Sequence, residues 1–179
     1  MQSMHLWLKD KHPVLKFLLG FTGCMAVFYI FYHSSLYRNF IEAPFLNILA
    51  NISNGILQLL GHNTEVAGAL IFSKSFSVDI RNGCDGLEAI AIFVSGILIF
   101  PVPFRRKVPG LAYGILTLMV LNLLRIAGLY LIGLNFSPTV FEVFHVQGGF
   151  IIFTMISVIL LFAWMNWAMR QPQPPTPGP

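Results

Sequence analysis

Four long apolar segments constrain this chain more than any other feature. They run from about Leu15 to Tyr32, Leu87 to Pro101, Val108 to Leu134 and Gln147 to Ala168. Lipid offers no partner to an unpaired backbone group, so apolar segments of this kind cross a bilayer as helices. Composition agrees, because 56% of the residues are hydrophobic and only 10% are charged. The sequence therefore predicts an all-α integral membrane protein with about four transmembrane helices.

The cations predict how these helices are oriented. Lys9 and Lys11 precede the first apolar segment, Lys16 lies at its start, and Arg105-Arg106-Lys107 joins the second segment to the third. Short loops rich in Lys and Arg stay in the cytoplasm. We therefore expect both termini and this loop to be cytoplasmic. Residues 1–170 are predicted to form one membrane-embedded domain, and the proline-rich residues 171–179 a disordered cytoplasmic tail.

Two further segments follow other patterns. From Glu42 to Leu60, apolar residues share one helical face and Asn and Gln residues share the other. This pattern predicts an amphipathic helix, which lies either in the outer interface or against the bundle. From Thr64 to Arg81, polar residues alternate with β-branched and aromatic ones, which predicts a short β-hairpin. Open strand edges are not tolerated in lipid, so the hairpin is expected outside the membrane.

Cys84 is the first candidate for chemistry. It lies where the hairpin leads into the second apolar helix, between Gly83 and Asp85-Gly86. Glycines give close backbone access and a helix N-terminus favours a thiolate, so we expect a nucleophile with a lowered pKa. The alternative is a small residue that merely begins a helix. Cys24 lies within the first apolar helix, and both cysteines are predicted to be free thiols.

A residue count from the cytoplasmic loop places Arg125 at the depth of Cys84. Cys84 lies 21 residues before Arg105, and Arg125 lies 20 residues after it. Antiparallel helices then bring the two to one layer near the outer surface, and His145 begins the last helix within a turn or two of that layer. An arginine in an apolar helix costs at least about 2.5 kcal/mol, which indicates a functional site. The alternative is an arginine that extends to the interface.

Three other side chains complete this layer. His145 has the side chain that acts as base and acid near neutral pH, although alone it would indicate only an aromatic belt at the membrane surface. Asn122 shares a helical face with Arg125. Glu88, one turn after Cys84, is placed either to pair with Arg125 or to raise the thiol pKa, and its role stays open.

Three spaced motifs resemble those of the exosortase and archaeosortase family of membrane transpeptidases. They are Cys84-Asp85-Gly86, Asn122-Leu123-Leu124-Arg125-Ile126 and Glu142-Val143-Phe144-His145. The resemblance covers roughly Val66 to Ala168 and is greatest to the short exosortase H subgroup. Many members have Ser or Thr where this chain has Asp85, and many have more helices. These departures bear on the target motif more than on the chemistry.

The resemblance implies a cysteine protease and transpeptidase of the bacterial inner membrane. Such enzymes cleave a C-terminal sorting signal, made of a short motif, a transmembrane helix and a basic tail, from secreted proteins. Cys84 would attack the scissile carbonyl, Arg125 would stabilise the oxyanion or hold the substrate, and His145 would act as base and then acid. Asn122, Glu88, Asp85 and Gly86 would support them. The acceptor, whether an amine, a glycan-linked group or water, is not readable from the chain.

The resemblance also implies which partners the protein binds. We expect secreted substrate proteins and membrane lipid as partners, no nucleic acid, and no cofactor or metal. The competing hypothesis is a non-catalytic membrane assembly subunit, in which Cys84, Arg125 and His145 form an interhelical polar cluster that holds a partner protein. A thiol-based redox protein would need a second cysteine at reachable depth, which Cys24 does not supply.

Overall fold

The computed structural model describes the backbone of residues 2–170 and the side chains of residues 13–145 and 151–170; the predicted tail, 171–179, lies outside the described residues. Helices dominate the chain. They are α1 (Gln2–Tyr32), η1 (Tyr37–Glu42), α2 (Ala43–Leu59), α3 (Leu87–Ile99), α4 (Phe104–Asn135), α5 (Pro138–Glu142), η2 (Val143–Gly148) and α6 (Gly149–Arg170), where η denotes a π-helical segment. The predicted all-α membrane fold is confirmed.

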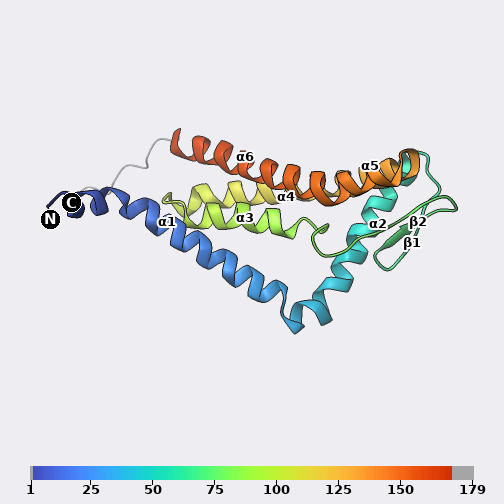
Figure 1. Cartoon of the computed structure of the whole chain (residues 1–179), viewed down its shortest axis with the longest axis horizontal. Helices are drawn as coiled ribbons and strands as arrows, with labels where there is room; N and C mark the ends of the chain where they lie inside the picture. The colour runs from blue at the N-terminus through green and yellow to red at the C-terminus, as the bar shows by residue number, and fades with distance from the viewer. Residues whose placement is uncertain (1, 171–179) are drawn as a thin grey trace.

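The helix α3 lies at the centre of the bundle and packs against α1, α4 and α6. Figure 1 shows α6 running alongside α3 and α4, whereas α1 inclines away from them towards its junction with α2. From that junction α2 returns across the bundle to the strands. Both buried clusters of apolar side chains include residues of α4, which joins the centre of the bundle to the sheet.

Four described helices are long and apolar enough to cross a membrane: Pro13–Tyr32, Tyr37–Leu59, Phe104–Asn135 and Ile151–Arg170. The number of helices that could cross a membrane therefore agrees with the prediction, but one of the four is a different segment. The predicted span from Leu87 to Pro101 is the 13-residue helix α3. Its length of about 20 Å is short of the roughly 30 Å hydrocarbon core. Tyr37–Leu59, which contains most of the predicted amphipathic helix, qualifies instead.

The amphipathic helix α2 packs on the bundle. Its apolar face, which includes Leu49 and Leu57, is buried in one cluster with Ile126 of α4. Its amides bond to the segment that contains the strands, since Asn47 donates to the Gly68 carbonyl at 3.0 Å and Gln58 to the Thr64 carbonyl at 3.1 Å. The helix α2 therefore packs on the bundle through Leu49 and Leu57, while Ile48, Ile52 and Leu59 of the predicted apolar face remain exposed.

Three short strands form the end of the bundle that we call the sheet end. They are β1 (Glu65–Ala67), β2 (Leu70–Phe72) and β3 (Ser77–Asp79), antiparallel in the order β1-β2-β3. The sequence predicted one hairpin, and Gly68 accounts for the second. Its φ of 65° is the left-handed conformation that a tight turn between β1 and β2 requires. Ile71 and Val78 bury the inner face against the helices.

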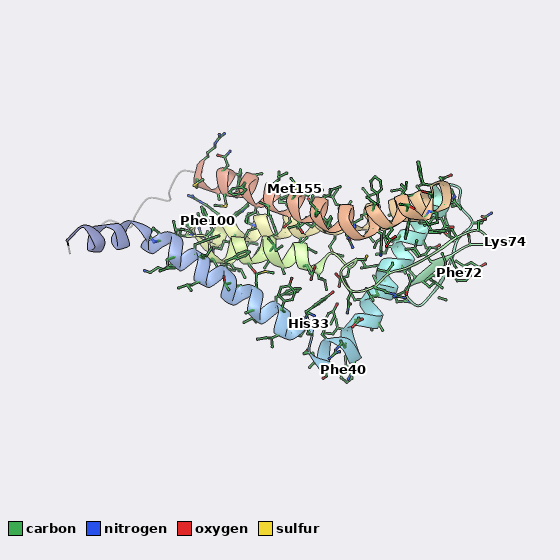
Figure 2. The ribbon with its side chains drawn as sticks, viewed as in Figure 1. His33, Phe40, Phe72, Lys74, Phe100 and Met155 are labelled. Atoms are coloured by element: carbon green, nitrogen blue, oxygen red, sulfur yellow. The ribbon has the colours of Figure 1, made fainter. Side chains whose placement is uncertain are left out.

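The opposite end, which we call the basic end, joins α3, α4 and α6. Arg106 donates to the Ala168 carbonyl at 2.8 Å, Lys107 donates to the Leu98 carbonyl, and the Trp164 indole donates to the Arg106 carbonyl at 3.2 Å. Cations are favourable near the C-termini of helices, where carbonyl groups lack partners. Figure 2 shows Phe100 in this part of the bundle and Lys74 far from it, at the sheet end.

Candidate active site

The three side chains expected in one layer lie in contact. Cys84 comes from the loop between β3 and α3, Arg125 from α4, and His145 from η2. The Cys84 Sγ lies 3.9 Å from both His145 Nδ1 and Nε2, and Arg125 Nη2 donates to the same sulfur at 3.9 Å. Thiol, imidazole and guanidinium are the set needed for nucleophile, base and oxyanion donor.

This cluster is recessed from the sheet end. Arg125 lies ten residues before the last residue of α4, Asn135, a rise of about 15 Å. Because α3 begins only at Leu87, the loop that carries Cys84 descends to the same depth. Cys84 itself is half-buried. The short α3 is therefore what places the thiol below the surface of the bundle.

Two glycines in the left-handed conformation shape the Cys84 loop. Gly83 has a φ of 87° and Gly86 a φ of 79°. A β-carbon on Gly86 would lie 2.9 Å from the Asn122 Cγ, so only glycine lets the loop approach α4 this closely. The Cys84 amide donates to the Arg81 carbonyl at 2.9 Å and closes the turn. Gly86 and Asn122 thus set how near the Cys84 loop lies to α4.

The carboxylates after Cys84 have distinct partners. Asp85 is fully buried, and its Oδ1 accepts from the Leu87 amide at 3.1 Å in the first turn of α3. Its Oδ2 accepts from the Tyr32 hydroxyl of α1 at 2.7 Å. Glu88 accepts from the Tyr29 hydroxyl at 3.3 Å. In the described part of the chain Glu88 forms no ion pair with Arg125, so one of the two roles considered for it is not found.

Arg125 reaches Cys84 across the backbone of α6. Its guanidinium carbon lies 5.9 Å from the ring centroid of Phe153, a cation–π contact. It also lies against Gly149, where a β-carbon would stand 2.5 Å from Nη2. Among the described residues, the buried Nε of Arg125 and both amide atoms of Asn122 have no hydrogen-bond partner. Arg125 Nε and Asn122 Nδ2 are therefore buried donors without a partner within the described part of the chain.

The His145 ring is held by aromatic neighbours. It stacks on Phe141 with centroids 5.3 Å apart and an interplanar angle of 10°, and Phe141 packs edge-on against Phe76. Because Sγ is equidistant from the two ring nitrogens, it is aligned with neither, and a short rotation of the imidazole is needed for proton transfer. The π-helical segment η2 carries His145, and such segments recur at functional sites.

Burial determines the protonation of the thiol and the imidazole. Burial raises the pKa of the Cys84 thiol, and the positive charge of Arg125 opposes this without reversing it. The expectation of a lowered pKa was therefore wrong, because desolvation outweighs the nearby cation. Burial lowers the pKa of His145, with Arg125 and Arg81 acting in the same direction. At neutral pH the resting pair is a protonated thiol beside a neutral imidazole.

Two cavities lie near Arg125. A groove of about 330 Å³ between α4 and α6 is lined by apolar residues such as Leu124, Ile152 and Phe153, and Arg125 is the charged side chain among its described lining residues. On the other side, Arg125 and Phe153 also line a narrow crevice against the Cys84 loop at Gly83. This pair of side chains thus borders both the groove and the crevice at the Cys84 loop.

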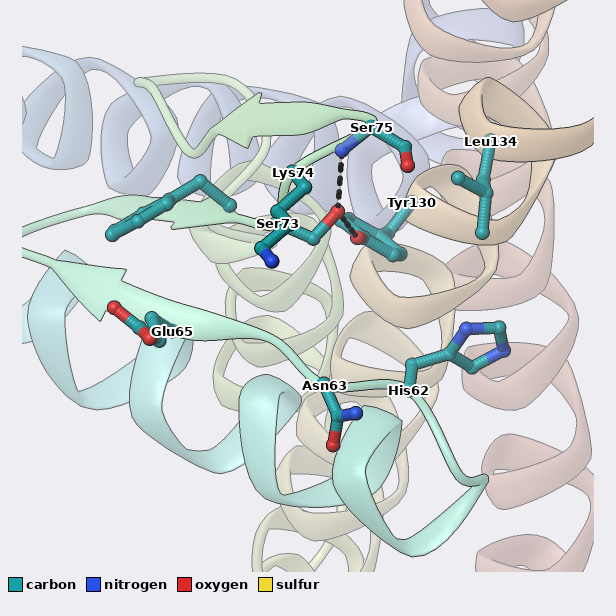
Figure 3. A pocket seen from close by; sticks show the side chains of 9 residues that line it. His62, Asn63, Glu65, Ser73, Lys74, Ser75, Tyr130 and Leu134 are labelled. Carbon is teal, nitrogen blue, oxygen red and sulfur yellow. Dashed lines mark hydrogen bonds between the residues drawn. The ribbon is translucent and has the colours of Figure 1, made fainter.

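A third cavity, of about 520 Å³, lies at the sheet end, and the described residues that line it do not include Cys84, Arg125 or His145. Figure 3 shows His62, Lys74 and Tyr130 around it, with the Tyr130 hydroxyl bonded to Ser73 Oγ. That bond is 2.8 Å long. Its lining mixes cationic and anionic side chains, and this mixture singles out no ligand class.

The sequence did not indicate every residue near the thiol. Tyr29 and Tyr32 contact the Cys84 region from α1, and Gly149 and Phe153 position Arg125 from α6. A weak signal was available for the tyrosines, because hydroxyls three residues apart share one face of an apolar helix. Gly149 and Phe153 show no pattern that separates them from ordinary packing residues.

Comparison with known proteins places the chain in a family. The family model described as transmembrane exosortase (Exosortase_EpsH) matches residues 7–162, a range that includes Cys84, Arg125 and His145. No curated protein and no solved structure matches the chain. The family match covers far more than half of the sequence and agrees with the resemblance in the three motifs. The chain belongs to the transmembrane exosortase family.

Proposed function

We propose that this exosortase is a membrane cysteine transpeptidase that cleaves the C-terminal sorting signal of secreted proteins through a thioester on Cys84. Family membership supports a membrane transpeptidase role. The observation that supports the cysteine mechanism is the contact of one sulfur with both His145 and Arg125, each 3.9 Å away and each on a different element. The cleaved protein is then transferred to an acceptor.

The chemistry follows from the resting protonation states. Neutral His145 takes the proton of Cys84 as the sulfur attacks the scissile carbonyl carbon, and a tetrahedral oxyanion forms. Arg125 donates to this oxyanion. The imidazolium gives its proton to the leaving amine, the C–N bond breaks, and an acyl thioester remains on Cys84. The acceptor loses a proton to His145, attacks the thioester and restores the thiol.

The unpaired donors beside the thiol support the oxyanion step. The Arg125 Nε and the Asn122 amide are buried without partners, which costs free energy in the resting protein. A substrate carbonyl oxygen that becomes an oxyanion would give such donors a partner, and the bond would strengthen as charge develops. Donors positioned in advance are worth more in a site that excludes water.

The groove between α4 and α6 supports a substrate with an apolar segment. It is open to the bundle surface, and its charged residue is Arg125. We assign it to the start of the transmembrane helix that follows the scissile bond in a sorting signal. A substrate that lies there has its cleavage point next to Arg125 and can reach the Cys84 loop once the side chains of Arg125 and Phe153 move aside.

We further propose that the sheet end faces outward from the bacterial inner membrane and the basic end faces the cytoplasm. The support is the cluster of cations at Arg105-Arg106-Lys107. Single cysteines are introduced at Ser75 or Arg105 in a Cys24→Ser, Cys84→Ala background and treated with an impermeant maleimide. Labelling of intact cells at Ser75 and not at Arg105 is expected. The reverse pattern would place the site on the cytoplasmic side and exclude secreted substrates.

Substitution of the thiol tests the function. Cells that produce a secreted protein with a C-terminal sorting signal are compared by its electrophoretic mobility, with the Cys84→Ala variant against Cys24→Ala as the matched control. Cys84→Ala should accumulate normally and process nothing, and Cys24→Ala should process at the parental rate. If the polar cluster is only structural, Cys84→Ser should be mild and Arg125→Ala should lower the amount of protein.

A further inference from the structure

The hydroxyl of Tyr32 binds the residues on both sides of the nucleophile. It donates to the Asp85 Oδ2 at 2.7 Å and accepts from the Gly83 amide at 3.3 Å. Cys84 stands between these two partners. The sequence separations are 53 and 51 residues, so the contact ties the end of α1 to a distant loop. One hydroxyl therefore fixes the backbone before and after the thiol.

Burial makes this contact strong. Tyr32 is 4% exposed and Asp85 is 0% exposed. A hydrogen bond to a carboxylate is about twice as strong as one between neutral groups, and it gains further in a low-dielectric interior. The second oxygen of Asp85 accepts from the first turn of α3. Asp85 thus links the Cys84 loop to the start of α3 and to the end of α1.

A second tyrosine repeats the contact one turn away. Tyr29 donates to Glu88 Oε1 at 3.3 Å. Tyr29 and Tyr32 are three residues apart on α1, and Asp85 and Glu88 are three residues apart at the start of α3, so both pairs lie on facing surfaces. Figure 1 shows α1 inclining away from α3 towards this end. A long side chain with a terminal hydroxyl is what spans such a gap.

We propose that Tyr32, with a smaller contribution from Tyr29, is a positioning residue that holds the Cys84 loop so that Sγ faces Arg125 and His145. Neither tyrosine touches the reacting sulfur in the contacts described. The inference rests on the proposed function, because it treats Cys84 as the nucleophile. It gives Asp85 a structural task and gives Glu88 a partner other than Arg125.

The test removes one hydroxyl and keeps the ring. Tyr32→Phe retains the stacking on Phe28, at 5.3 Å between centroids. Tyr130→Phe is the matched control, because it also removes a buried hydroxyl with a hydrogen bond, to Ser73, outside the Cys84 loop. Three quantities are measured in the full chain: the kcat of sorting-signal cleavage, its KM, and the hydrogen exchange of the amides of residues 83–87 without substrate.

Tyr32→Phe is expected to affect the Cys84 loop and the rate of cleavage but not the rest of the bundle. Tyr32→Phe should lower kcat between about 10-fold and 100-fold, as expected when a reacting group is misplaced by up to 1 Å, with KM within about twofold. Exchange in residues 83–87 should accelerate while exchange in α4 stays unchanged. Tyr130→Phe should leave kcat, KM and the exchange of residues 83–87 at the parental values. Tyr29→Phe should give a smaller loss, since its partner bond is exposed.

Other outcomes overturn the proposal. It is wrong if Tyr32→Phe leaves kcat and exchange at the parental values, if only KM rises, or if Tyr130→Phe causes an equal loss. If Tyr32→Phe does not accumulate, the double variant Tyr32→Phe/Asp85→Asn is used, because it also removes the buried charge of Asp85 that has lost its partner. A parental kcat in the double variant refutes the inference. Hydrogen exchange needs no substrate, so it tests the positioning even if Cys84→Ala retains cleavage and the proposed function fails.

Discussion

The guanidinium of Arg125 occupies the space that a side chain on residue 149 would need. A β-carbon built on Gly149 lies 2.5 Å from Nη2 and 2.7 Å from Nε. Favourable contacts begin at about 3.5 Å, so Gly149→Ala must move the guanidinium by about 1 Å. The arginine side chain is flexible, and the variant is expected to fold with this displacement taken up by Arg125.

The cost to catalysis follows from the distances. Arg125 Nη2 lies 3.9 Å from the Cys84 Sγ, so a shift of about 1 Å misplaces the guanidinium relative to the thiol. A misplacement of that size lowers rates by up to about 100-fold, equivalent to about 2.7 kcal/mol of transition-state stabilisation. We expect cleavage of the sorting signal by Gly149→Ala to slow by about this factor while the amount of protein stays at the parental level.

The assay follows the shift in electrophoretic mobility of a co-produced substrate with time. Gly23→Ala is the matched control, because a β-carbon on Gly23 of α1 meets no atom within 4 Å. The control should process at the parental rate. If Gly149→Ala processed substrate within about threefold of Gly23→Ala, the position of the Arg125 guanidinium would not matter, and its proposed role would be refuted.

Three further predictions use the same assay. Arg125→Lys keeps the charge and loses the planar donors, so it should fold and cleave at least about 100-fold more slowly; a parental rate would make Arg125 a simple cation. Gly128 borders the groove and has open space around it, so Gly128→Phe should fill the groove and raise KM, whereas the control Gly23→Phe should not. An unchanged KM in Gly128→Phe would show that the groove does not bind the substrate. Burial lowers the pKa of His145 from its usual 6.5, so kcat/KM should fall only below pH 6.5, where the imidazole becomes protonated. A midpoint of this loss above pH 6.5 would contradict a neutral His145 in the resting protein.

The depth of the site was predictable from the sequence because it depends on counting. Counting residues from the Arg105 turn placed Cys84 and Arg125 at one level, and the two side chains are in contact, although only residues 87–99 of the stretch between Cys84 and Arg105 form the helix α3. The three motifs then identified the family. The sheet was predicted only in part, because the glycine turn at Gly68 adds a strand to the expected hairpin.

The contacts of α1 were not predictable in this way. No charge on its apolar surface marks the face that meets α3, and its rotation depends on packing such as Gly20 against Ile99. The contact between Tyr32 and Asp85 follows from that packing. The direction of the Cys84 pKa was wrong for a related reason, since the sequence shows the neighbouring charges but not how deeply the thiol is buried.

Detection of the thioester tests the central claim most directly. The purified protein is mixed with a sorting-signal substrate without an added acceptor, quenched in acid and examined by mass spectrometry. We predict that the part of the substrate before the scissile bond is attached to Cys84, that hydroxylamine releases it, and that Cys84→Ala forms no adduct. Continued cleavage by Cys84→Ala, or cleavage by the parental protein with no adduct at Cys84 at any time, would contradict nucleophilic catalysis by this cysteine.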